Sequence, residues 1–205
     1  MIISTITEAI GSTPLYRFDN QHYSMPKGSA IYAKLEYLNP GGSIKDRLGS
    51  YLIKEGFAQG KINEKTTIIE PTAGNTGIGS GGTFAGTSTF LKEKYPDIRI
   101  IGVEPEGSVL NGGDPAPHEI EGIGVEFIPP FLSPLSINQI ETISDVEGFN
   151  YTRQLAREQG LLVGSSSGAA FAAALREIRR LPPGHRVVTI FPDAADRYLS
   201  KNIYL

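Results

Sequence analysis

The sequence predicts an α/β protein with a mostly parallel, twisted sheet and helices on both faces. Short β-branched runs alternate with longer helical patterns through most of the chain, and such alternation is typical of parallel sheets with crossover helices. Glycine-rich loops follow several of the predicted strands, where ligands of open α/β sheets bind. The 205 residues suffice for one good core or two small domains.

The first half is expected to contain a helix at 4–10, a strand at 31–38, a helix at 44–59, a strand at 66–70 and a helix at 84–94. Gly11 ends the first helix, and Gly60 suits the C′ position of the second. Leu48, Tyr51, Leu52 and Ile53 form one apolar side of that second helix. The run at 66–70 is β-branched, and basic residues close the last turn of the helix at 84–94.

The second half is expected to contain strands at 98–104, 139–143, 161–163 and 187–191, with helices at 144–160 and 169–180. Ser144 and Glu147 form a capping box, and Gly160 is a stop signal. The helix at 169–180 is rich in alanine. A loop at 105–124, rich in Gly, Pro and Asn, is longer than a plain connection needs, which favours a functional role.

Composition excludes several classes of protein. The net charge of −3 and the absence of a basic cluster argue against a nucleic-acid surface. The chain has no cysteine, which excludes disulfides, thiolate catalysis and cysteine-ligated metal, and no metal site is expected. The N-terminus lacks a signal-peptide pattern, and no apolar run reaches membrane-span length. A cytoplasmic protein that binds no membrane is therefore expected.

The stretch 39–47, Asn-Pro-Gly-Gly-Ser-Ile-Lys-Asp-Arg, joins a predicted strand to a predicted helix. Ser43 is the expected N-cap, and Asp46 stands three residues on in a variant of the capping box. Lys45 then lies in the first helical turn, where the partial positive charge lowers the pKa of an ammonium group. A partly neutral lysine is a nucleophile for carbonyl groups. The alternative is a solvated lysine beside a glycine turn.

Two adjacent loops suit anion binding. The loop at 71–77, Pro-Thr-Ala-Gly-Asn-Thr-Gly, offers free N–H groups to a carboxylate or phosphate, although an ordinary turn is the alternative. The loop at 77–83 fits G-x-G-x-x-G through Gly77, Gly79 and Gly82, with Glu104 as acidic ribose partner of a dinucleotide. Because 71–76 separate this motif from its strand, a phosphate cradle at a helix N-terminus is the safer interpretation.

The loop at 164–168, Gly-Ser-Ser-Ser-Gly, fits the G-x-S-x-G nucleophile elbow with Ser166 at its apex. A hydrolase of that class needs its acid and then its histidine later in the chain. His185 precedes Asp193 and no histidine follows, so the order is wrong. A serine-capped helix, or a serine hydroxyl that faces a bound ring nitrogen, are the other interpretations.

Together these stretches resemble the cysteine synthase and cystathionine β-synthase family, pyridoxal-phosphate (PLP) enzymes of fold type II. The matching residues occur in order along nearly the whole chain, at 39–47, 72–77, 80–83, 122–124 and 166–169. The resemblance implies PLP as cofactor and β-replacement on O-acetylserine as the reaction.

The resemblance also implies a role for each matching residue. Lys45 would form the Schiff base with PLP and act as general base. Asn75 would bind the ring hydroxyl and Ser166 would face the pyridine nitrogen. The phosphate would be held by Gly79, Ser80, Gly81, Gly82 and Thr83. The substrate carboxylate would be held by Thr72, Gly74 and Thr76, with Gly122 at the site entrance.

One departure concerns the acceptor. The family usually has serine where this chain has Ala73, and alanine is similar to the subgroup that joins O-acetylserine to homocysteine. The stretches 118–122 and 196–200 resemble that subgroup too. The acceptor is therefore sulfide, giving cysteine, or homocysteine, giving cystathionine.

A second departure concerns the domains. In the family a small mobile domain of roughly a hundred residues separates the loop like 72–77 from the phosphate loop. Here Ser80 follows Gly77 almost at once. We therefore interpret 1–205 as the large PLP-binding domain with an apparent gap near 77–80. Either a mobile segment is absent from this sequence, or the molecule itself lacks the domain.

The gap also weakens the dinucleotide interpretation, because the apparent G-x-G-x-x-G would then consist of two separate motifs that the gap has joined. An NAD-binding oxidoreductase nevertheless stays open as a remote alternative, as does a non-catalytic protein that retains its cofactor or binds a partner. The resemblance implies a homodimer.

Overall fold

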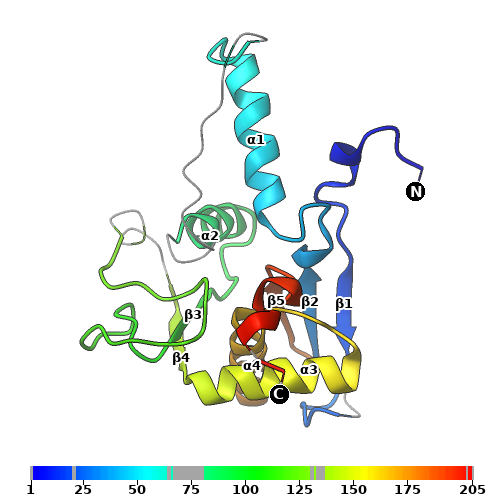
Figure 1. Cartoon of the computed structure of the whole chain (residues 1–205). Coiled ribbons are helices and arrows are strands. Elements are labelled where there is room, and N and C mark those ends of the chain that lie inside the picture. Colours follow the sequence, from blue (N-terminus) through cyan, green and yellow to red (C-terminus); the bar gives the residue numbers. More distant parts are fainter. Residues whose placement is uncertain are drawn as a thin grey trace.

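The computed structural model describes residues 2–19, 22–63, 66, 81–129, 132, 137–201 and 203–204. Apart from short 3-10 helices, the elements of this part of the chain come as two strands followed by two helices, twice, and then a last strand (Figure 1). The expected strand at 66–70 lies outside the described residues except for residue 66. The other predicted elements can be compared directly with the structure.

The described strands form two sheets. In the first, the order is β1 (Leu15–Phe18), β2 (Ala30–Leu35) and β5 (Arg186–Phe191). β2 pairs parallel to β5, from Ala30 opposite Arg186 to Leu35 opposite Phe191, and antiparallel to β1. The second sheet pairs β3 (Ile101–Pro105) parallel to β4 (Gln139–Ile143). The parallel pairings are as predicted, whereas β1 was not predicted.

The helices are α1 (Lys45–Ala58), α2 (Gly82–Lys94), α3 (Asp145–Gln159) and α4 (Ser165–Arg180), with short 3-10 helices η1 (Ile6–Ala9), η2 (Glu36–Leu38) and η4 (Ala195–Lys201). The Ser144 cap of α3 is confirmed: its side chain accepts a hydrogen bond from the Glu147 N–H. Gly160 ends α3 with φ of 65°, in the left-handed region that favours glycine.

Several predicted limits differ from the structure. The strand expected at 98–104 begins only at Ile101, and the helix expected at 4–10 is a short 3-10 helix at Ile6–Ala9. Residues 36–38 leave the strand and form η2, and 161–163 contribute only an isolated bridge between Val163 and Ala194. α4 begins four residues earlier than predicted, so its first turn includes the serines. Serine favours caps and turns over helix interiors, which is why the sequence pattern placed these residues in a loop.

The hydrophobic core is divided into two clusters that α4 joins. Phe171, Leu175 and Ile178 of α4 pack with residues of β1, β2 and β5. Ala172 and Ala173 pack instead with Ile120 and Ile143 beside β4. α4 is therefore buried along most of its length, which fixes the position of its N-terminal turn.

α1 projects away from this core (Figure 1). None of its residues is buried, and Tyr51, Leu52 and Phe57 are exposed. The predicted apolar side of this helix is therefore exposed rather than packed against the core. Among those residues, no helix is long and apolar enough to cross a membrane.

Candidate active site

Lys45 is the first residue of α1 and is half-buried. Its N–H donates to the Ser43 hydroxyl oxygen at 3.3 Å. The expected capping box is only partly correct, because Ile44 is the N-cap and the Asp46 carboxylate accepts from the Gly41 N–H at 2.6 Å. These two local hydrogen bonds stabilise the turn before Lys45.

The buried carboxylate of Glu36 anchors the turn that carries Lys45. Glu36 is 2% exposed, and it accepts hydrogen bonds from Thr13 at 2.8 Å, from the Asn39 amide at 2.8 Å and from the Arg47 guanidinium at 2.7 Å through both nitrogens. Arg47 Nη2 also donates to the Gly11 carbonyl at 2.9 Å. Asn39 and Arg47 flank Lys45 in the sequence, so Glu36 restrains the lysine on both sides.

The partners of Glu36 decide its charge. Burial raises the pKa of Glu36, but hydrogen bonds from Arg47, Thr13 and Asn39 and the charge of Arg47 outweigh burial, so the pKa lies below its usual value. A carboxyl whose folded pKa is depressed stabilises the protein above its unfolded pKa, and this contribution is lost as the pH falls through the folded pKa. Glu36 is therefore ionised in the folded protein near neutral pH.

Glu36→Gln should lower the free energy of unfolding by about 2 kcal/mol at pH 7, because hydrogen bonds to charged groups contribute about 1.5–3 kcal/mol. The difference in unfolding free energy between Glu36→Gln and the parent should be full above about pH 5 and should become smaller below about pH 4. Urea denaturation across this pH range measures it. Glu93→Gln, on the exposed side of α2, is the control, and an equal pH dependence of both variants would contradict the role given to Glu36.

The N-terminus of α2 begins at Gly81, which is buried and has φ of 73°. A Cβ at this position would lie 3.0 Å from the Leu132 side chain, so both conformation and space favour glycine. Gly82 and Thr83 form the first turn, which contains no acidic residue. The N–H groups of such a turn suit an anion. The predicted partners Gly79 and Ser80 lie outside the described residues.

The first turn of α4 places three serines in the interior. Ser165, Ser166 and Ser167 are all buried, with Ser166 4% exposed. The Ser167 hydroxyl has no hydrogen-bond partner in the described part of the chain. Ser166 has helical backbone within this turn, whereas a nucleophile elbow holds its serine in a strained turn between strand and helix. This geometry argues against the hydrolase interpretation, as does the order of the acid and the histidine in the sequence.

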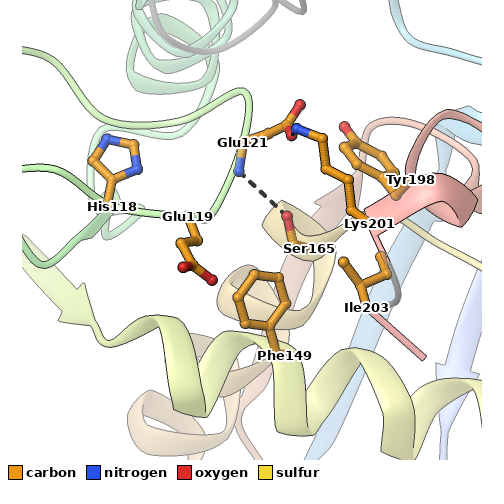
Figure 2. Close-up of a pocket in the computed structure, with 8 residues that line it drawn as sticks. All are labelled: His118, Glu119, Glu121, Phe149, Ser165, Tyr198, Lys201 and Ile203. Atoms are coloured by element: carbon orange, nitrogen blue, oxygen red, sulfur yellow. Dashed lines mark hydrogen bonds and ion pairs between the residues drawn. The ribbon is translucent and has the colours of Figure 1, made fainter. Parts of the chain in front are cut away.

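The loop before β4 meets the N-terminus of α4 at a cavity of about 490 Å³ (Figure 2). The Glu121 N–H donates to Ser165 Oγ at 3.3 Å, and the Glu121 carboxylate pairs with Lys201. Asp145 holds the same loop by accepting from the N–H groups of Glu119 and Ile120. Gly122 follows directly with φ of 80°, so this loop lies beside the turn that carries Ser166.

With this geometry established, comparison with known proteins decides the family. A model of the pyridoxal-phosphate dependent enzymes matches residues 6–79 and 77–193. The chain belongs to this family. A cysteine synthase of Helicobacter pylori is 49% identical over 305 aligned positions, which cover all of both chains. An O-acetylserine dependent cystathionine β-synthase of Bacillus subtilis is 36% identical and covers 99% of this chain and 98% of its own.

Solved structures agree with the assignment. The crystal structure of an O-acetylserine dependent cystathionine β-synthase from Helicobacter pylori has a TM-score of 0.93, with 48% identity and full coverage of both chains. An O-acetylserine sulfhydrylase of Entamoeba histolytica has a TM-score of 0.86 and covers all of this chain and 92% of its own, but at 24% identity it shows the fold alone. The chain is thus a PLP-dependent enzyme with the predicted fold type II architecture.

The described residues fit PLP. The α2 N-terminus offers N–H groups and no acidic residue where a phosphate needs donors. The α4 N-terminus holds buried hydroxyls, one of them without a partner, where a ring needs polar contacts. Asn75 and the residues Thr72, Gly74 and Thr76 lie outside the described residues, so their predicted roles stay predictions.

The remote interpretation as a dinucleotide-binding protein fails at Glu104, its expected ribose ligand. Glu104 is 1% exposed, and its carboxylate accepts from the N–H groups of Leu110 and Asn111 at 2.9 and 3.0 Å and from the Thr142 hydroxyl at 3.2 Å. These bonds close the turn after β3 and leave no carboxylate for a ribose. Glycine spacing alone cannot separate this structural glutamate from a nucleotide ligand.

Proposed function

We propose that this chain catalyses β-replacement on O-acetylserine with sulfide as acceptor, giving cysteine and acetate. The observation that carries the proposal is a single lysine, Lys45, held at a helix N-terminus by a network of main-chain and side-chain bonds. Family membership and the cysteine synthase relatives at 49% and 47% identity support the reaction. An amino-acid substrate and a thiol acceptor follow from the same relatives.

In the proposed mechanism Lys45 Nζ would hold the cofactor and, once the substrate amine has replaced it, would take the proton from Cα. Bound PLP withdraws electrons from Cα, which makes this proton acidic. The Cβ–O bond of the substrate would break as acetate leaves with its electron pair, and hydrosulfide would then form the Cβ–S bond. Lys45 Nζ then returns the proton to Cα, so the protein ends the cycle unchanged.

The remaining roles belong to binding. Gly79, Ser80, Gly81, Gly82 and Thr83 would hold the phosphate through N–H and hydroxyl donors. Ser166 would face the ring nitrogen and keep it largely neutral, and Asn75 would bind the ring hydroxyl. The substrate carboxylate would be held by Thr72, Gly74 and Thr76, with Gly122 at the entrance.

Homocysteine is the second candidate acceptor, with cystathionine as product. The 48% identical neighbour is an O-acetylserine dependent cystathionine β-synthase. The cavity in Figure 2 also contains charges of both signs, with Glu119, Glu121 and Lys201 among its lining residues. An amino-acid acceptor carries an ammonium and a carboxylate and would meet opposite charges there, whereas sulfide needs no such contacts.

The acceptor experiment supplies PLP and O-acetylserine to the purified chain, with sulfide or homocysteine in parallel reactions. Cysteine formation with the higher kcat/KM supports the main proposal. A preference for homocysteine would replace it with cystathionine synthesis. PLP binding without either product would favour the non-catalytic alternative.

We also propose that 1–205 is the large cofactor domain, with a gap near 77–80 where relatives have a mobile lid. The family model matches in two parts that meet at 77–79, and the 305-position alignment exceeds the 205 residues of this chain by about a hundred. Exposed Tyr51, Leu52 and Phe57 on α1 suit a missing neighbour. An intact mass of 22.1 kDa for the native protein would show that the domain is truly absent, whereas a larger mass would show that the protein has the domain and this sequence omits it.

A cytoplasmic homodimer completes the proposal. The cytoplasmic location is the expectation drawn from the sequence, and the homodimer is implied by the resemblance to the family. Sedimentation of the purified chain at several concentrations measures the subunit number, and a monomer at all of them would contradict the dimer.

A further inference from the structure

The segment after β5 lies between the two loops that carry the cofactor contacts. On one side, the Ile44 N–H donates to the Pro192 carbonyl at 2.8 Å and the Ala194 N–H donates to the Gly42 carbonyl at 3.3 Å. On the other side, the Gly164 N–H donates to the Asp193 carbonyl at 3.2 Å. Asp193 is the central residue, so its main chain sets the spacing between the turn of Lys45 and the turn of Ser166.

The side chain of Asp193 is turned toward the N-terminus of α4. Asp193 is 8% exposed, and its Oδ2 accepts from the Tyr198 hydroxyl at 2.5 Å. Its Oδ1 is buried and has no hydrogen-bond partner among the described residues. A Cβ on Gly164, the N-cap of α4, would lie 2.3 Å from this oxygen and 2.5 Å from the Tyr198 ring. Oδ1 therefore lies directly against the residue that begins the serine turn.

The charges around the pair keep the proton on Tyr198. Burial and the charge and hydrogen bond of Asp193 raise the pKa of Tyr198 far above its ordinary value. The pKa of Asp193 lies above its usual value, chiefly because of burial; the Tyr198 hydrogen bond and the charge of Arg197 only partly oppose this, and the charge of Asp196 adds to it. Tyr198 is thus a fixed donor that orients the carboxylate, and the second oxygen stays available.

An unpaired buried carboxylate oxygen is costly and calls for an explanation. The positive end of a helix stabilises a negative charge, but Oδ1 still accepts no hydrogen bond in the described part of the chain. The turn that it faces carries Ser166, the predicted contact of the cofactor ring.

We propose that Asp193 is a positioning residue for the cofactor ring: its carboxylate, oriented by Tyr198, lies against the N-cap of α4 and places its negative charge beside the ring site. This inference rests on the proposed PLP site. It adds a residue after β5 to the loops that bind the cofactor, and it assigns Tyr198 as the group that orients this residue.

The test compares Asp193→Asn, Tyr198→Phe and the parent by titrating each apo protein with PLP. Asp193→Asn keeps the size and the acceptor for Tyr198 but removes the charge. Its PLP affinity should fall by about tenfold, the loss of roughly 1.4 kcal/mol, and the visible absorbance bands of the bound cofactor should change in ratio. Asp97→Asn, which changes an exposed carboxylate in the turn after α2, should change neither quantity.

Tyr198→Phe should change the absorbance bands of bound PLP in the same direction, with a smaller loss of PLP affinity. If Asp193→Asn does not fold, Tyr198→Phe alone decides the test. Parent-like affinity and bands in a folded Asp193→Asn, or in Tyr198→Phe when it stands alone, would overturn the inference. A parent chain that binds no PLP would overturn the proposed function itself, which is a separate result.

Discussion

Lys45→Ala is expected to abolish turnover, with a decrease of at least about 1,000-fold, because the same amine would hold the cofactor and move the α-proton. No second lysine of α1 lies near enough to replace Lys45. Lys54, the other lysine of this helix, lies nine residues further along the chain and is exposed. Cysteine formation from O-acetylserine and sulfide measures the effect.

A second readout does not depend on turnover. Borohydride reduction should attach PLP covalently to the parent at Lys45, and peptide mass analysis should find no label at any lysine in Lys45→Ala. Lys54→Ala is the matched control and should keep both activity and the label. A fully active Lys45→Ala, or a parent labelled elsewhere, would refute the proposed mechanism.

The sequence predicts α3 well because its signals are local. The Ser144 cap, the acidic first turn and Gly160 act within a few residues of one another, and each is found in the structure. β4 is predicted with the limits 139–143 for a similar reason, because the β-branched residues Ile140, Thr142 and Ile143 stand directly before the Ser144 cap. Contacts between neighbours in sequence can be predicted from sequence.

Glu36 was missed because its contacts are long-range. Its partners Thr13 and Arg47 lie 23 and 11 residues away, and nothing near Glu36 in the sequence marks it as buried. Glu104 was misinterpreted for the same reason, since its acceptor role depends on a turn that the sequence pattern does not predict. The start of α4 depends on packing against α3, which outweighs the weak helix propensity of serine.

That packing is tested by Gly168→Ala, which should lower the free energy of unfolding by about 3 kcal/mol, at the upper end of the usual cost of overpacking. A Cβ at Gly168 would lie 2.2 Å from the Gly148 carbonyl oxygen and 2.2 Å from Thr152 Oγ1. Thr152 already donates to that carbonyl at 2.9 Å. The carbonyl belongs to the α3 backbone and cannot move alone, so the two helices must separate.

Gly49→Ala is the matched control because Gly49 is also inside a helix but has nothing within 4 Å of its added Cβ. It should stabilise the protein by up to about 1 kcal/mol through helix propensity. Urea denaturation followed by circular dichroism measures both variants. A Gly168→Ala protein within about 0.5 kcal/mol of the parent would show that α3 and α4 tolerate separation. If the predicted loss is found, PLP affinity should fall as well, because the same displacement moves Ser166 in the first turn of α4.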